Sequence, residues 1–126
     1  MIYGIGTDIV EISRITRLLA KYGERFVKRV LTHSEREDYA KARQSAAFIA
    51  KNFAAKEALS KAVGTGFRYP VILSHISIAH DHRGKPELRF HPVLELYLKE
   101  RDIVGHHVSL TDEKHLACAV VVLERA

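Results

Sequence analysis

A long alanine-rich run without glycine or proline, from Ser45 to Val63, is the feature that most constrains how this chain folds. Alanine has the highest helix propensity, whereas glycine and proline destabilise a helix interior most. Ser45 is suited to be the N-cap of such a helix, and Gly64 is suited to end it. We therefore expect a long helix over Ser45 to Val63, around which the rest of the 126-residue chain packs.

The segment before this run predicts a strand followed directly by a helix. Ile2–Val10 is rich in β-branched residues and contains Gly4 and Gly6, which leave room for another backbone to approach closely. From Ile12 to Tyr22 the apolar residues recur with helical spacing, and Gly23 is a natural stop. The N-terminal part of the chain is therefore expected to be a strand-helix unit.

The other predicted elements are shorter. One is a helix that begins at Thr32 or Ser34 and ends near Lys41. A strand over Ser74–His80 follows, and the chain returns as a strand over Glu87–Phe90 through the turn Asp81–Pro86. A helix then opens at Pro92 and buries Val93, Leu94, Tyr97 and Leu98, and two last strands cover Val104–Thr111 and Leu116–Leu123. In the strand over Val104–Thr111, a face made of Gly105, His107, Ser109 and Thr111 is polar enough to line a site. Because no repeat or linker interrupts this pattern, it predicts one α+β domain over residues 1–126.

Composition and charge limit the kind of protein. With 47% hydrophobic and 28% charged residues, the chain is typical of a soluble globular protein. No apolar run approaches the ~20 residues of a membrane-spanning helix, and Met1–Gly6 lacks the pattern of a secretory signal. We therefore expect a cytoplasmic protein without a membrane partner. The formal charge of +5 favours an acidic partner. Cys118 cannot form an internal disulfide and is expected to be a small buried apolar residue.

Two acidic residues, Asp8 and Glu57, stand among small and apolar neighbours, which predicts partial burial. A partly buried carboxylate needs a cation, hydrogen-bond donors or a raised pKa. If the strand end and the long helix meet, the two carboxylates can hold Mg²⁺, which prefers oxygen ligands and often keeps substrate phosphate and water as well. A salt bridge or a contact with a helix N-terminus explains the same pattern.

Other signals are weaker when each is taken alone. Lys61 follows Glu57 by one helical turn, which is typical of a surface ion pair but also allows the carboxylate to face a metal while the ammonium faces a phosphoryl group. Gly64-Thr65-Gly66 ends a helix and offers backbone amides to a phosphate. The segment Asp81–Pro86 is a hairpin turn or a basic loop over an anion. His107 is by default a structural histidine.

Taken together, these segments resemble one known family. Gly4–Ile12 (GIGTDIVEI) and Phe53–Ala62 (FAAKEALSKA) resemble the two long motifs of holo-acyl-carrier-protein synthases. The similarity continues through Gly64-Thr65-Gly66, Gly84-Lys85-Pro86 and His107–Leu110, so it covers nearly the whole chain in the right order. The resemblance implies the 4′-phosphopantetheinyl transferase fold, with a mainly antiparallel sheet packed on the long helix.

The resemblance also implies an activity and a cofactor. Enzymes of this family transfer the 4′-phosphopantetheine group of coenzyme A to a serine of an apo acyl carrier protein and release adenosine 3′,5′-bisphosphate, in support of fatty acid biosynthesis. Carried over to this chain, Asp8 and Glu57 bind Mg²⁺ on the diphosphate of coenzyme A, and Lys61 is catalytic and contacts the phosphoryl group. Glu57, directly or through a water on the metal, is the candidate general base.

Partners and an assembly are implied as well. Active sites of the family lie between subunits of a homotrimer. The first helix resembles the part of the family that docks the carrier protein, so a basic face of that helix is expected to meet an acidic partner. The residues carried over are Gly64, Thr65, Gly66, Lys85, Pro86 and His107 for the nucleotide end of coenzyme A, and Arg14, Arg17 and Lys21 for the carrier protein.

The chain departs from the family pattern at two places. Asn52 stands where relatives usually have arginine or lysine, which removes one phosphate contact or moves it to Lys51 or Lys56. Tyr69-Pro70 replaces a glycine-containing turn, so that loop is expected to have its own shape.

Two other classes of protein fit parts of the sequence. A small basic nucleic-acid-binding module fits the net charge, but only 8% of residues are aromatic and no basic stretch is interleaved with stacking residues. A structural subunit without chemistry fits the composition but leaves Asp8 and Glu57 unexplained. We therefore expect carrier protein and coenzyme A, and no nucleic acid, as partners.

Overall fold

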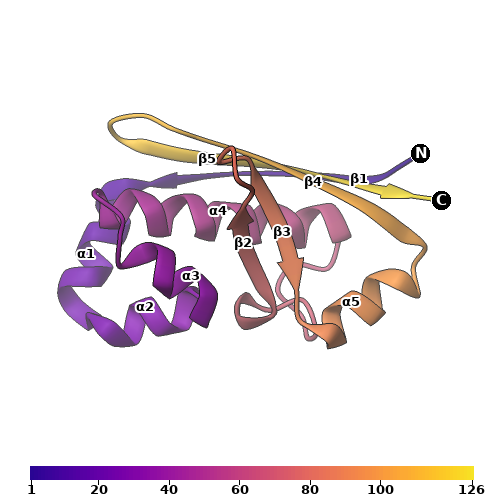
Figure 1. Ribbon diagram of the computed structural model, residues 1–126, viewed down its shortest axis with the longest axis horizontal. Helices are drawn as coiled ribbons and strands as arrows, with labels where there is room; N and C mark the ends of the chain where they lie inside the picture. Colours follow the sequence, from indigo (N-terminus) through magenta and orange to yellow (C-terminus); the bar gives the residue numbers. More distant parts are fainter.

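The computed structural model describes all 126 residues and is built around one central helix, α4 (Ser45–Val63). A three-stranded antiparallel sheet lies along one side of α4 (Figure 1), in the order β1 (Ile2–Glu11), β5 (Leu116–Arg125) and β4 (Ile103–Asp112). The other side of α4 is covered at one end by helices and at the other by a hairpin and a short helix. The α+β class and the antiparallel sheet on a long helix are therefore confirmed.

The elements on that other side follow the chain order. At the N-terminal end of α4 lie three helices, and at its C-terminal end lie the second sheet and the last helix (Figure 1). They are α1 (Ile12–Tyr22), α2 (Glu24–Val30), α3 (His33–Tyr39), the single 3-10 turn η1 (Leu73–His75), the antiparallel pair β2 (Ile76–His80) and β3 (Pro86–Phe90), and α5 (Pro92–Lys99).

Strand β1 and helix α4 are in direct backbone contact, and two glycines make this possible. A Cβ atom added at Gly6 would lie 1.9 Å from the carbonyl oxygen of Ala58, and one added at Gly4 would lie 2.0 Å from that of Ala62. Such distances are far below van der Waals contact, so neither position accepts a side chain without moving the strand. The expectation of a close backbone approach at these glycines is confirmed.

A hydrophobic cluster of 25 buried residues joins the sheet, α4 and the elements beneath it. Because α4 is covered on both sides, it is buried around most of its circumference instead of showing one apolar stripe. None of the helices is long and apolar enough to cross a membrane.

Several local predictions need correction. Helix α2 was not predicted, and Gln44 rather than Ser45 is the N-cap of α4. Of the two N-cap candidates for α3, the structure uses Thr32. Val93 is 40% exposed instead of belonging to the buried stripe of α5. Cys118 is only partly buried, since it lies on the outer face of the sheet, away from α4.

Candidate active site

Asp8 and Lys61 meet at the edge of the three-stranded sheet. Asp8 belongs to the face of β1 that is directed to α4, and its side chain is 17% exposed. Lys61, in the last turn of α4, donates from Nζ to Asp8 Oδ1 at 3.1 Å and to the Thr7 carbonyl oxygen at 2.9 Å. The close packing of β1 on α4 at Gly4 and Gly6 therefore determines where this carboxylate and this ammonium lie.

Glu57 lies one turn before Lys61 on α4 and is half-buried. Burial raises the pKa of the Glu57 carboxyl, and the negative charge of Asp8 raises it further, while Lys61 and then Arg14 of α1 oppose the shift. Glu57 is thus within electrostatic range of Asp8, Lys61 and Arg14. The two acidic residues, 49 positions apart by their numbers in the sequence, lie at one site.

This donor set fits a magnesium ion that is shared with a phosphate ligand. Two neighbouring carboxylates offer hard oxygen ligands, and the charge of Asp8 raises the cost of ionising Glu57, which a divalent cation relieves. No group of three or more His, Cys, Asp or Glu side chains gathers anywhere in the chain. Mg²⁺ usually binds through one or two carboxylates and leaves its other positions to water and substrate phosphates, so a two-carboxylate site suits it.

The predicted contacts for the nucleotide of coenzyme A fall into two groups. Gly64, Thr65 and Gly66 directly follow the end of α4, beside Lys61. Lys85, Pro86 and His107 instead line a separate open pocket of about 590 Å³ between β3 and β4. Within one chain, the structure does not bring the second group to Asp8 and Glu57.

The direction of the side chains explains this separation. Asp8 faces α4, whereas His107 lies on the opposite face of the same sheet, where its ring Nε2 lies 2.5 Å from Glu124 Oε1. A ligand that touches both groups would have to reach around the sheet or lie between two chains.

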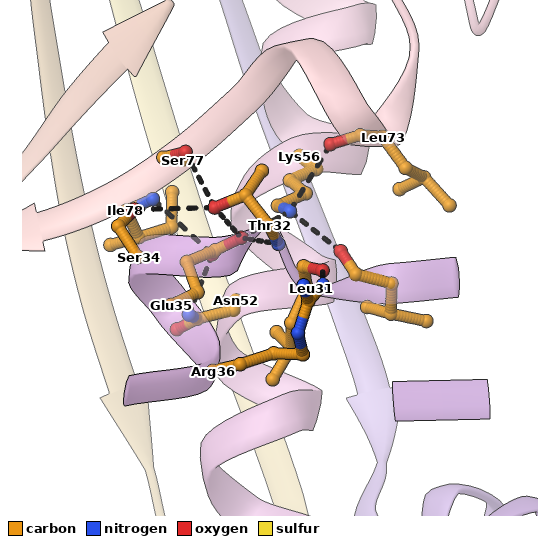
Figure 2. Close-up of polar contacts among 11 residues, drawn as sticks. Leu31, Thr32, Ser34, Glu35, Arg36, Asn52, Lys56, Leu73, Ser77 and Ile78 are labelled. Atoms are coloured by element: carbon orange, nitrogen blue, oxygen red, sulfur yellow. Dashed lines mark hydrogen bonds and ion pairs between the residues drawn. The ribbon is translucent and has the colours of Figure 1, made fainter. Parts of the chain in front are cut away.

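Lys56, which was proposed as a phosphate contact, and Asn52, where the chain departs from the family pattern, both form hydrogen bonds in the interior (Figure 2). Lys56 is completely buried and donates from Nζ to Glu35 Oε1 at 2.6 Å, to the Val30 carbonyl at 2.6 Å and to the Leu73 carbonyl at 3.2 Å. Asn52 is 2% exposed and donates from Nδ2 to Glu35 Oε2 at 2.8 Å. The expectation that Lys56 takes over a phosphate contact is therefore wrong, because its ammonium has no access to solvent. Lys51, the other residue proposed for it, pairs with Asp112 at 3.4 Å and keeps partial exposure.

The basic face of α1 is exposed and continues onto α2. Arg14, Arg17 and Lys21 are all exposed. Beside them lies a shallow pocket of about 420 Å³ that α1 and α2 form together, with apolar walls and two arginines. It is lined by Leu18, Tyr22, Arg25, Phe26 and Arg29. Sequence reasoning missed the α2 half of this surface because it did not predict that helix.

Comparison with known proteins identifies the family of this chain. Residues 4–121 match the model of the family described as the 4′-phosphopantetheinyl transferase superfamily. The chain belongs to this superfamily.

Within the superfamily, the chain is similar to holo-[acyl-carrier-protein] synthases over its full length, which confirms the family resemblance seen in the sequence. The enzyme of that name from Nitrosospira multiformis is 61% identical over 125 residues, covering 99% of this chain and 100% of the relative. The crystal structure of holo-[acyl-carrier-protein] synthase from Neisseria meningitidis superposes with a TM-score of 0.96 at 46% identity, covering 99% of this chain and 100% of the other. The enzyme from Bacillus anthracis, in complex with CoA (3′,5′-ADP), gives a TM-score of 0.84 at 39% identity over 100% of this chain and 99% of the other.

Proposed function

We propose that this protein transfers the 4′-phosphopantetheine group of coenzyme A to a serine of an apo acyl carrier protein and releases adenosine 3′,5′-bisphosphate, in support of fatty acid biosynthesis. The observation that carries this proposal is the cluster of Asp8, Glu57 and Lys61 at the contact of β1 with α4. The full-length similarity to holo-[acyl-carrier-protein] synthases supports it.

Asp8 and Glu57 would hold Mg²⁺, which supplies positive charge to the diphosphate of coenzyme A when it is bound. Lys61 is exposed over 53% of its side chain, and its ammonium can reach a phosphoryl oxygen beside these carboxylates. Charge on phosphoryl oxygens grows during such a transfer, so a preorganised cation at this point stabilises the transition state.

In the reaction, the serine oxygen forms a bond to the phosphorus that carries the pantetheine. The bond from that phosphorus to the oxygen bridging the two phosphorus atoms breaks, and the electron pair leaves with adenosine 3′,5′-bisphosphate. Glu57 is our candidate for the base that accepts the serine proton.

We further propose a homotrimer whose active sites lie between subunits. Where β1 and β5 lie side by side, the outer face of the three-stranded sheet exposes apolar side chains, with Ile5 at 59%, Ile9 at 64% and Val120 at 41%. A contiguous apolar patch of this kind marks a protein interface. In such an assembly, the pocket of Lys85, Pro86 and His107 from one subunit would complete the site of Asp8 and Glu57 in its neighbour. Gly64, Thr65 and Gly66 would lie at the interface between the two subunits.

The acyl carrier protein would dock on the basic face of α1. The exposed Arg14, Arg17 and Lys21, together with Arg25 and Arg29 around the adjoining pocket, provide positive charge beside an apolar surface. An acidic amphipathic helix fits both features.

We also propose that residues 1–126 act as one domain, because one buried cluster joins all layers. The cytoplasmic location expected from the sequence stays a prediction.

Intact mass measurement of apo carrier protein incubated with the enzyme, coenzyme A and Mg²⁺ tests the proposal. We expect a gain of one phosphopantetheine that requires the metal. Asp8→Asn and Glu57→Gln keep the side-chain shape but remove a charge, and each should lower the rate by about 100-fold or more. Glu113→Gln, an exposed carboxyl at the turn between β4 and β5, serves as the matched control. Wild-type turnover in either site variant would show that the metal assignment is wrong.

A further inference from the structure

His107 and Glu124 form an isolated side-chain pair on the outer face of the sheet. His107 is on β4 and Glu124 is on the adjacent strand β5, where His107 pairs with Val122 and Glu124 pairs with Gly105. The two side chains are therefore diagonal neighbours on one face, within reach of each other. His107 Nε2 lies 2.5 Å from Glu124 Oε1, so the two side chains are hydrogen bonded.

Gly105 leaves the space in which the Glu124 side chain lies. A Cβ atom added at Gly105 would be 3.0 Å from Glu124 Oε1 and 3.3 Å from Glu124 Cβ, which is closer than ordinary van der Waals contact. The backbone of Gly105 does not have the positive φ that requires glycine. Glycine at position 105 therefore makes room for the Glu124 side chain, and it is not needed for a special backbone conformation.

The pair determines which ring nitrogen of His107 is available. The hydrogen bond from His107 lowers the pKa of the Glu124 carboxyl, so this group is ionised at neutral pH. An ionised carboxylate can only accept hydrogen bonds, so the Nε2 atom of His107 must carry the hydrogen. The other nitrogen, Nδ1, is left for a further contact, and the ring is held in one orientation.

We propose that Glu124 is a positioning residue for the nucleotide end of coenzyme A, acting through His107. This inference rests on the proposed function, in which His107 contacts the nucleotide from the pocket that it lines with Lys85 and Pro86. Glu124 binds Nε2–H and thereby presents Nδ1 of His107 to the ligand. Gly105 keeps the space that this arrangement needs. At metal sites, carboxylates that orient a metal-binding histidine through its other ring nitrogen contribute substantially to metal affinity, and the geometry here is analogous.

Steady-state kinetics with wild-type enzyme and Glu124→Ala test this role. Glu124→Ala should raise the KM for coenzyme A by about 2- to 10-fold, the usual range for one intramolecular hydrogen bond, with kcat and the KM for carrier protein nearly unchanged. Glu124→Gln, whose amide oxygen can still accept from Nε2–H, should recover most of the affinity. Gly105→Ala should give a partial increase in KM by crowding Glu124. Glu113→Ala, at the other end of the same hairpin, is the control.

A double-mutant cycle and a spectroscopic measurement distinguish a role of Glu124 in orienting His107 from a general loss of structure in the variant. In a His107→Ala background, Glu124→Ala should have no further effect on the KM for coenzyme A. Long-range ¹H–¹⁵N correlation spectra should show the Nε2–H form of His107 in the wild type and a mixture of tautomers in Glu124→Ala. Additive effects in the cycle, an unchanged KM in Glu124→Ala, or the Nδ1–H tautomer in the wild type would each overturn the inference.

The activity of the wild-type enzyme distinguishes a failure of the proposed function from a failure of the proposed role of Glu124. If wild-type enzyme modifies carrier protein while Glu124→Ala keeps its KM for coenzyme A, only the role of Glu124 is wrong. If wild-type enzyme transfers nothing, the proposed function is wrong. In that case, calorimetric titration with 3′,5′-ADP decides the role of Glu124: equal affinity of wild type and Glu124→Ala overturns it, and weaker binding by the variant supports it.

Discussion

Among single side chains, Glu35 and Lys56 do the most to connect the elements around α4. Besides Lys56 and Asn52, the Glu35 carboxylate accepts from the backbone N–H of Thr32 at 2.8 Å and of Ile78 at 3.2 Å (Figure 2). Every buried side-chain polar atom of the chain has a partner. A buried ion pair costs much desolvation, so what it contributes is a defined arrangement of α3, α4 and β2 more than net stability.

Removing one partner of this pair should destabilise the protein strongly. We expect Lys56→Met to lower the free energy of unfolding by about 3–5 kcal/mol, because it leaves the Glu35 carboxylate buried without a counter-charge. Adding Glu35→Gln should recover part of this loss, since the amide oxygen still accepts hydrogen bonds and carries no charge. Urea denaturation at one fixed protein concentration measures both. A double variant less stable than Lys56→Met would contradict this account.

His106 makes the stability of the fold depend on pH. Burial lowers the pKa of the His106 imidazole below its ordinary value, and the charges of His107 and Arg89 lower it further, while the charges of Glu87 and Glu95 oppose the shift. The unfolded chain therefore binds the proton more strongly than the folded chain. The free energy of unfolding should thus fall as pH decreases from about 6.5 through the folded-state pKa of His106.

Thermal or urea unfolding between pH 7.5 and pH 5 checks this dependence on pH. His106→Gln should make the decrease in stability on acidification smaller, because it removes the group that takes up the proton on unfolding. His82→Gln, in the exposed turn between β2 and β3, should leave it unchanged. An identical decrease in His106→Gln and in the wild type would exclude His106 as the cause.

At the level of elements, α1 and α2 form the surface that meets the carrier protein in our proposal. Helix α2 was not predicted because it has only seven residues, about two turns, and begins directly after Gly23, which leaves too few apolar positions to establish a helical repeat. Its buried residues Val27 and Val30 anchor it, while Arg25 and Arg29 extend the basic face. The apolar pocket between the two helices could not be seen without it.

Reversing one charge on α1 should weaken carrier-protein recognition specifically. We expect Arg17→Glu to raise the KM for carrier protein by about 5-fold or more and to reduce its dependence on salt, while the KM for coenzyme A stays the same. Lys99→Glu, at the end of α5, makes the same change away from this surface and is the control. Equal effects of both variants would point to net charge instead of a docking surface.

Over the whole molecule, the apolar outer face of the sheet is the feature that argues for assembly. If the proposed trimer forms, we expect Ile5→Glu to convert it to monomers and to abolish transfer, although Asp8, Glu57 and Lys61 are unchanged. Leu96→Glu on α5 is a matched control, because Leu96 is 58% exposed and Ile5 is 59% exposed. Light scattering coupled to size exclusion measures the mass. A fully active monomer would show that the site does not need a second subunit.

The sequence determines much of this architecture through local signals. The helix Ser45–Val63 and its end at Gly64 follow from propensity and the stop residue, and the α+β class follows from the order of periodic segments. The meeting of Asp8 with Glu57 does not follow from such signals, because it depends on how β1 packs on α4. The family motifs made it predictable. Neither source indicated that Asn52 and Lys56 are buried, since both residue types are usually on the surface.

The contact of β1 with α4 through Gly4 and Gly6 has a consequence for how this protein can vary. The spacing of the two acids depends on main-chain atoms touching main-chain atoms, and hardly on the shapes of the surrounding apolar side chains. Much of the hydrophobic interior can therefore change among homologues or in engineered libraries without altering the geometry for chemistry. A methyl group at either glycine, in contrast, would lift the strand and take the carboxylate with it.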